Sequence, residues 1–390
     1  MKHITLRKNP MSIESEFENR SKRELIRVVG GLPNGAYPAN PRAGTIQFIL
    51  KESSDRISAE IARATREGKA FGTLLKNQID GVLSDTHGKL DSTIQSAMVK
   101  QWNLADEKNT RIVINQTRGL AVPATMATAM NQLNPTALSA FLNRSDRGFT
   151  LSDRIWLLMD GNREKINKYL ASGIVTGRSA AGVSRDVRKL LVDPDKLFRR
   201  VRNPDTGELI ESARSQSYNP GTGKYKSSYM NALRLAATEI NMSYRMSDFM
   251  RRKKLPNVIG VRVNLSPSHP RPDICDAMVG AYPKGFLFMG FHPLCICYTT
   301  AILMSRNELR RYFKTHQKPE ARIVRSIPKQ ADEYVKTNLE RFRGYKRQPY
   351  WLRDNFKPDG SLMGKVTECC WYRHGYSKCD TYANHSRSHG

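Results

Sequence analysis

The chain has 390 residues and carries 64 Lys and Arg against 36 Asp and Glu, a formal net charge of +28 at pH 7. A surface this basic attracts polyanions, and the phosphates of DNA or RNA are the commonest of these. No segment approaches the ~20 apolar residues of a membrane span, and the first ten residues lack the apolar core of a signal peptide, which argues against a membrane or secreted protein.

Residues 1–50 mix charge with turn signals such as Gly30 to Gly35, and this pattern indicates a flexible N-terminal arm. From Ser54 onward, apolar residues recur at spacings of three and four and predict a helical region over 51–150. Gly88 marks a predicted break between two of its helices.

The helical pattern continues from residue 151 to Leu191, with Ser179 as a candidate cap for the last of these helices. The turn residues Asn203 to Gly207 lie between two short apolar segments and predict a hairpin. A long helix is then expected over 226–254, ended by Pro256.

After this helix the apolar period changes to two, which predicts a half-buried strand from Ile259 to Leu265 and a second strand from Cys297 to Leu303. Further helices are expected around 306–315 and 329–343. The predicted fold is therefore α+β, with mainly helical N-terminal and middle regions and a small C-terminal β unit.

The segment between the two predicted strands contains the densest set of candidate metal ligands. Zinc prefers about four Cys and His ligands gathered from two short loops. The candidates for a structural zinc site are His269, Cys275, His292, Cys295 and Cys297. The alternative is a packed loop whose cysteines are small apolar core residues. A catalytic metal is less favoured, because no HExxH-type helix accompanies the segment.

The six cysteines fall into two groups, as expected for metal ligands or free thiols in a reducing compartment rather than for a disulfide framework. The second group lies in the tail and could also bind zinc, although a flexible tail with spare thiols is the preferred interpretation. The tail candidates are Cys369, Cys370, His374, Cys379, His385 and His389.

Several polar residues of the long predicted helix share one face, because they lie at spacings of i, i+4 and i+7. They could anchor the following loops by hydrogen bonds, with a buried arginine paired to a loop carboxylate, or they could form a solvated face. The candidate anchors are Arg234, Thr238, Glu239, Asn241, Asp273 and Asp276.

Two runs of basic residues are candidate phosphate contacts. The alternative for each run is an ordinary solvated surface. The candidates are Arg199, Arg200 and Arg202 in the predicted hairpin, and Arg251, Arg252, Lys253 and Lys254 at the end of the long helix.

Three segments, in this order, resemble the core of the phage Mu F-like head-morphogenesis proteins, also called minor head proteins. They are Ala171 to Ser179, Arg234 to Asn241 (RLAATEIN), and Asp273-Ile274-Cys275-Asp276 through His292-Pro293-Leu294-Cys295-Ile296-Cys297. The resemblance covers about residues 150–305. The chain is thus divided into a flexible arm (1–50), a helical region (51–150), a Mu F-like domain (151–305), and a basic helical extension with a Cys/His-rich tail (306–390).

The resemblance implies a non-enzymatic structural protein of a tailed phage, located near the portal. Its expected partners are portal, capsid and scaffold proteins and the packaged double-stranded DNA. It would be found in the host cytoplasm during assembly and then in the virion. The alternative is a metal-dependent nuclease or hydrolase that uses His269, Asp273 and His292.

Overall fold

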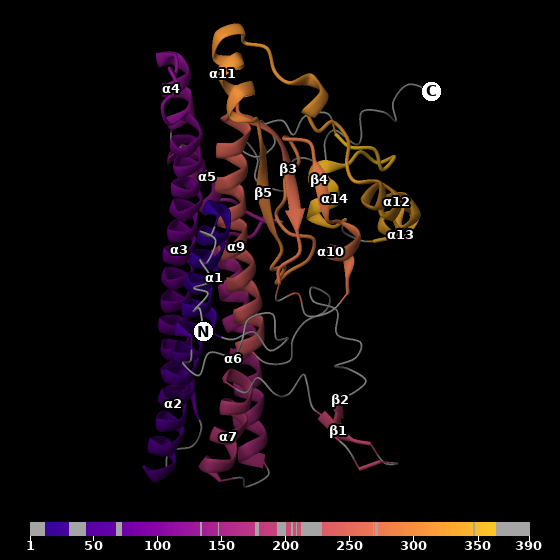
Figure 1. Cartoon of the computed structure of the whole chain (residues 1–390). Helices are drawn as coiled ribbons and strands as arrows, with labels where there is room; N and C mark the ends of the chain where they lie inside the picture. Colours follow the sequence, from indigo (N-terminus) through magenta and orange to yellow (C-terminus); the bar gives the residue numbers. More distant parts are fainter. Residues whose placement is uncertain are drawn as a thin grey trace, which may run out of the picture.

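The computed structural model describes residues 12–30, 44–67, 72–132, 135–146, 148–175, 179–192, 200–203, 206–207, 209–211, 228–267, 269, 272–345 and 348–363. Long helices lie side by side in one half of the molecule, and a small sheet with short helices forms the other half (Figure 1). This is the predicted α+β architecture, mainly helical with a small sheet in the C-terminal part.

The long helices form a bundle in which α9 packs mainly against α3, and α2 packs against both α3 and α7. Their apolar faces meet in one core. The bundle helices are α1 (Ile13–Val29), α2 (Thr45–Arg66), α3 (Thr73–Thr117), α6 (Leu151–Val175), α7 (Ala180–Leu191) and α9 (Ser228–Lys254), with the short α4 (Ala124–Asn131) and α5 (Pro135–Leu142) beside them.

The N-terminal region differs from the prediction, because α1 is a packed helix and not part of a flexible arm. The Ser12 hydroxyl caps it by accepting a hydrogen bond from the Ser15 amide at 3.1 Å. Phe17 and Leu25 are buried on the face that packs against α3 and α9. The apolar spacing of this helix is present in the sequence just before the Gly- and Pro-rich residues.

The predicted helix break at Gly88 is also wrong, because α3 runs through it for 45 residues. At 1.5 Å per residue the helix is roughly 68 Å long. A Cβ atom at Gly88 would meet nothing within 4 Å, so this glycine lies on an open side of the helix. The buried Leu83, Leu90 and Ile94 keep the core face continuous, and packing outweighs the cost of about 1 kcal/mol for a helical glycine.

The β unit is an antiparallel sheet in the order β4-β3-β5, built from β3 (Val258–Asn264), β4 (Gly280–Tyr282) and β5 (Tyr298–Leu303). Val263 pairs with Thr299 of β5, and Val261 pairs with Tyr282 of β4. The two longer strands are confirmed, and β4 was not predicted. The predicted hairpin is confirmed as β1 (Arg200–Arg202) and β2 (Leu209–Glu211), which pair antiparallel.

Short helices surround the sheet. Their bounds are α10 (Ile274–Ala277), α11 (Arg306–Thr315), the 3-10 helix η1 (Glu320–Arg322), α12 (Lys329–Thr337), α13 (Leu339–Arg343) and α14 (Tyr350–Asn355).

The cores do not follow the predicted domain boundaries. The bundle core extends from Leu25 to Leu294 and Ile296, so it crosses the boundary at 150/151. The core of the β unit combines Val261 with Trp351, so it crosses the boundary at 305/306. The segment 329–356 is therefore an integral part of the β unit, since its buried side chains cover the sheet. None of the described helices combines the length and apolarity that a membrane crossing requires.

Candidate metal centre

The first loop of the site is shaped by a reciprocal cap at the start of α10. The Asp273 carboxylate accepts a hydrogen bond from the Cys275 amide at 2.6 Å, and the Asp276 carboxylate accepts one from the Asp273 amide at 2.7 Å. This capping box satisfies backbone donors that would otherwise lack partners at a helix N-terminus. It fixes the position of Cys275 on the first turn, so Asp273 and Asp276 shape this loop through its own backbone.

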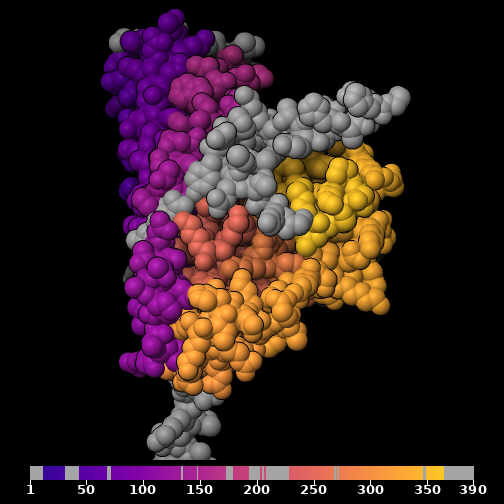
Figure 2. All heavy atoms as spheres, turned by 90° about the horizontal axis from the view of Figure 1, so that it is seen from above, coloured from indigo at the N-terminus to yellow at the C-terminus, as the bar shows by residue number. Residues whose placement is uncertain are grey.

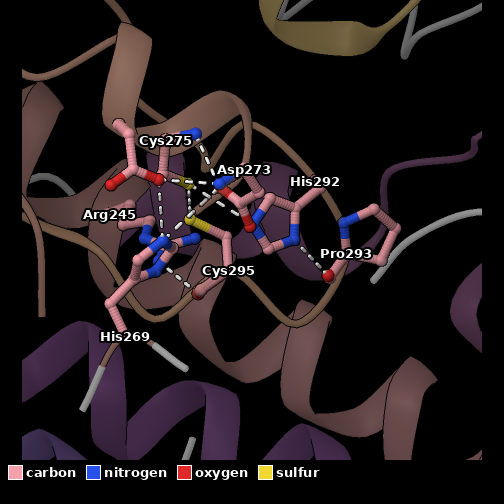
Figure 3. A network of polar contacts seen from close by, with 8 residues as sticks. Arg245, His269, Asp273, Cys275, His292, Pro293 and Cys295 are labelled. Carbon is pink, nitrogen blue, oxygen red and sulfur yellow. Dashed lines mark hydrogen bonds and ion pairs between the residues drawn. The ribbon is translucent and has the colours of Figure 1, made fainter. Parts of the chain in front are cut away.

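The second loop brings His292 and Cys295 to Cys275 (Figure 3). The Cys275 Sγ atom lies 3.3 Å from His292 Nε2 and 3.7 Å from Cys295 Sγ. These three ligand atoms all lie within 4.8 Å of one another, and both thiols are buried. Three of the five predicted metal ligands therefore converge.

A second group joins the first through a shared carboxylate. His269 Nε2 lies 3.1 Å from Asp276 Oδ2 and 3.7 Å from Asp273 Oδ1. Asp273 Oδ2 lies 3.1 Å from His292 Nε2. Asp273 thus bridges the two histidines, and His269 belongs to an acidic group rather than to the thiol group.

Cys297 is buried beside the other two thiols, but it lies outside the group formed by Cys275, His292 and Cys295. Its hydrogen bond with Cys275 lowers the pKa of its thiol, but its hydrogen bond with Cys295 and burial outweigh this and hold the pKa above its usual value. Cys297, next to the start of β5, was predicted as a metal ligand, but it does not belong to the group of three that converges.

Neighbouring charges in this cluster shift the pKa values of Cys295 and His292 in opposite directions. Burial alone would raise the pKa of the Cys295 thiol, but hydrogen bonds from Cys275 and Cys297 and the charges of Arg245 and His292 hold it well below its usual value. Burial opposes protonation of His292, but its hydrogen bond to Asp273 and the negative charge of Cys295 raise its pKa to about 9.

The loop from Met289 to Cys297 is held by Arg245, a residue that the sequence interpretation missed. Its guanidinium donates to the carbonyls of Met289 at 2.9 Å, Cys295 at 2.6 Å and Cys297 at 2.8 Å. The guanidinium also lies 4.9 Å from the centre of the Phe288 ring. Continuing the polar face of α9 by four residues beyond Asn241 would have found it.

Gly290 allows this close approach. Its φ angle is +101°, and a Cβ atom there would lie 2.6 Å from Arg245 Nη1 and 3.0 Å from the Cβ atom of Cys295. An L side chain would meet both backbone strain and a clash, so the position requires glycine.

The predicted polar face of α9 does anchor the loop. The Thr238 hydroxyl accepts a hydrogen bond from the Leu294 amide at 3.3 Å, and the Asn241 amide donates to the Cys295 carbonyl at 3.4 Å. Leu294 has a φ angle of +63°, a left-handed conformation that this bond helps to hold. Thr238 and Asn241 are therefore confirmed as anchors.

The other two candidate anchors on this helix act differently. Glu239 is buried and points to the helices, where it pairs with Arg144 and, at 2.8 Å, with Arg154. Arg234 is half-buried, and its carbonyl accepts a hydrogen bond from the Thr238 hydroxyl at 2.7 Å. The expected pairing of a buried arginine with Asp273 or Asp276 is corrected: those carboxylates face histidines, and the buried arginine, Arg245, binds backbone carbonyls.

The candidate phosphate contacts at the end of α9 divide into two pairs. Arg251 is 3% exposed and donates to the carbonyls of Gln132 and Met130, while Arg252 is 2% exposed and pairs with Asp248 at 2.9 Å. The prediction that these two contact nucleic acid is wrong, since their guanidinium groups are used inside the protein. Lys253 is half-buried and Lys254 is exposed, so both stay candidates.

The side chains of the remaining candidates lie outside the described residues. Arg199 lies outside the described residues, as do the side chains of Arg200 and Arg202 on β1. The tail group from Cys369 to His389 lies outside them as well.

Comparison with known proteins adds no relative to this description. No protein-family model, no curated protein and no solved structure matches the chain.

Proposed function

We propose that this chain is a minor head protein of a tailed phage, a structural component that enters the procapsid near the portal and touches packaged DNA without sequence preference. The main support is that two of the three segments carrying the resemblance form one packed unit. The Thr238 and Asn241 side chains of the α9 segment hydrogen-bond the backbone of the His292–Cys297 segment. Two segments that match the family in their order along the chain also contact each other in space. A chance resemblance would not require that contact.

The burial of the two thiols favours a structural role for them over a catalytic one. Cys275 and Cys295 are 1% and 2% exposed, and the loop carbonyls behind them are occupied by Arg245. A reacting group needs access to its substrate, whereas a group that joins two loops does not. The site therefore supports a folded platform rather than an enzyme.

One exposed basic surface that could contact DNA lies on α11 and the segment after it. Arg310, Arg311 and Lys314 are exposed, and none of them forms an ion pair with another described residue. Lys254 and Lys318 are exposed as well. In the view from above, the orange atoms of this part lie at an outer edge of the molecule (Figure 2). Such unpaired charges release counterions when they meet phosphates.

Replacing Arg310, Arg311 and Lys314 together by glutamine is expected to weaken binding to duplex DNA and to flatten its salt dependence. Each lost phosphate contact lowers the slope of log K against log salt by about 0.9, so three contacts lower it by about 2.7. Fluorescence anisotropy across a salt series measures this slope. The matched control replaces Arg185, Arg188 and Lys189 of α7, which are exposed as well and lie at the other end of the bundle (Figure 1). Equal losses in both variants would contradict a localised DNA surface.

The role in the particle is tested by mass spectrometry of purified phage particles from the strain that encodes this chain. The protein is expected in the particles in low copy number, and also in procapsids that have not packaged DNA. Its absence from both would contradict the proposed function, whatever the protein does with DNA in solution.

A metal-dependent nuclease or hydrolase is the second candidate, because Asp273 lies between His269 and His292 at 3.7 and 3.1 Å. It predicts cleavage of DNA or another ester substrate by the purified protein with added divalent metal, lost with a chelator and in His269→Ala. The structural proposal expects no turnover under any of these conditions.

A further inference from the structure

We infer that Asp273, Cys275, His292 and Cys295 form a structural zinc site that joins the loop before β4 to the loop before β5. This inference depends on the geometry of the four side chains and not on a role in a phage particle. Cys275 from the first loop lies within 4.8 Å of His292 and Cys295 from the second, and Asp273 from the first loop contacts His292 as the fourth candidate ligand.

Three separations between neighbouring ligand atoms match edges of a zinc tetrahedron, and Asp273 reaches the group of Cys275, His292 and Cys295 through His292. With Zn–S near 2.3 Å and Zn–N or Zn–O near 2.0 Å, the expected edges are about 3.8 Å for S···S, about 3.5 Å for S···N and about 3.3 Å for N···O. The observed distances are 3.7 Å between the Cys275 and Cys295 sulfurs, 3.3 Å from Cys275 Sγ to His292 Nε2, and 3.1 Å from His292 Nε2 to Asp273 Oδ2.

The orientation of His292 is that of a metal ligand. Its Nδ1 atom donates to the Pro293 carbonyl at 2.7 Å, which leaves Nε2 to face Cys275 and Asp273. Ligating histidines characteristically fix their tautomer through such a bond on the other ring nitrogen. On the other side, His269 contacts Asp273 Oδ1 and so orients the carboxylate without itself reaching the thiols.

The charges also balance around a divalent cation. Two thiolates and one carboxylate carry three negative charges, zinc supplies two positive charges, and the buried Arg245 beside Cys295 supplies the third. A mixed sulfur, nitrogen and oxygen set with tetrahedral edges suits zinc better than magnesium or calcium, which prefer six or more oxygen ligands. Four protein ligands leave no open position, as in structural sites.

The test measures metal content in the full chain with Cys369, Cys370 and Cys379 replaced by serine, so that tail cysteines cannot hold the metal. We expect one zinc per chain by mass spectrometry of the elements after dialysis. Asp273→Asn, Cys275→Ser, His292→Gln and Cys295→Ser are each expected to lose it. Cys297→Ser and His269→Gln are the matched controls and are expected to keep it.

Cobalt substitution keeps the inference testable if a ligand variant fails to fold. Co²⁺ added to metal-free protein is expected to give the visible bands of tetrahedral coordination and a thiolate charge-transfer band, both abolished by equimolar zinc. Folded protein that holds no stoichiometric zinc and gives no such bands would overturn the site. Loss of metal in Cys297→Ser with retention in Asp273→Asn would overturn the ligand assignment. Neither result depends on whether the protein occurs in phage particles.

Discussion

Replacing Arg245 by methionine is expected to lower the free energy of unfolding by about 4 kcal/mol. Methionine keeps most of the length and apolar volume of the side chain, but it leaves the carbonyls of Met289, Cys295 and Cys297 without their donor. A hydrogen bond to a charged group contributes about 1.5–3 kcal/mol, and the three bonds share one group and are not additive. Lysine at this position should recover only part of the loss, because a single ammonium cannot span three carbonyls.

Urea unfolding followed by tryptophan fluorescence measures this effect, since Trp351 lies in the core of the β unit. Arg262→Met is the matched control, because Arg262 lies on β3 but is exposed. Its free energy of unfolding should stay within about 0.5 kcal/mol of the original. If the two variants unfold at the same urea concentration, the guanidinium at residue 245 does not hold the loop.

Asp248→Asn is expected to cost about 3–5 kcal/mol, although the two side chains have nearly the same shape. The Asp248 carboxylate lies 2.5 Å from Lys108 Nζ and 2.9 Å from Arg252 Nη1, and it accepts a hydrogen bond from Thr299 at 3.2 Å. It therefore links α3, α9 and β5. Lys108 and Arg252 are 4% and 2% exposed, so a neutral amide leaves two buried cations without their counterion.

The loss in free energy of unfolding caused by Asp248→Asn should depend on pH. Burial would raise the pKa of Asp248, but Lys108 and Arg252 hold it below its usual value. A depressed carboxyl pKa adds stability above the unfolded value of about 3.9, and that stability is lost as the pH falls through the folded value. The difference between the original chain and Asp248→Asn is therefore expected to be full at pH 7 and to shrink below about pH 4.

The control for this prediction is Asp55→Asn, which alters an exposed ion pair with Lys51. Exposed pairs contribute at most about 1 kcal/mol, so little change is expected at any pH. A constant difference between the original chain and Asp248→Asn from pH 7 to pH 3.5 would show that the carboxylate charge is not what stabilises this junction.

Much of the fold could be predicted because periodicity is a local property. The alternation from Ile259 to Val263 and the helical spacing of Leu233, Ala236 and Ile240 identified β3 and α9. The failures at α1 and Gly88 have a common cause. Turn residues and glycine lower local propensity, and packing of the apolar face against neighbouring helices overrides that preference.

The site was predicted in part for the same reason. The clustering of Cys275, His292 and Cys295 could be found by inspection, since few residue types bind zinc. Which atoms converge depends on the left-handed turn at Leu294 and on the capping box of α10. Those features place His269 against Asp276 and leave Cys297 outside the group.

The sequence alone determined the helical and strand periods, the excess of basic residues and the grouping of potential ligands. The tertiary structure alone decided which basic residues face water. Arg251 and Arg252 stand directly before Lys253 and Lys254, yet the first two are buried and Lys254 is exposed. The reason is that each step along a helix rotates a side chain by about 100°. Only the positions of α3 and the β unit determine which of these directions leads into the core and which into solvent.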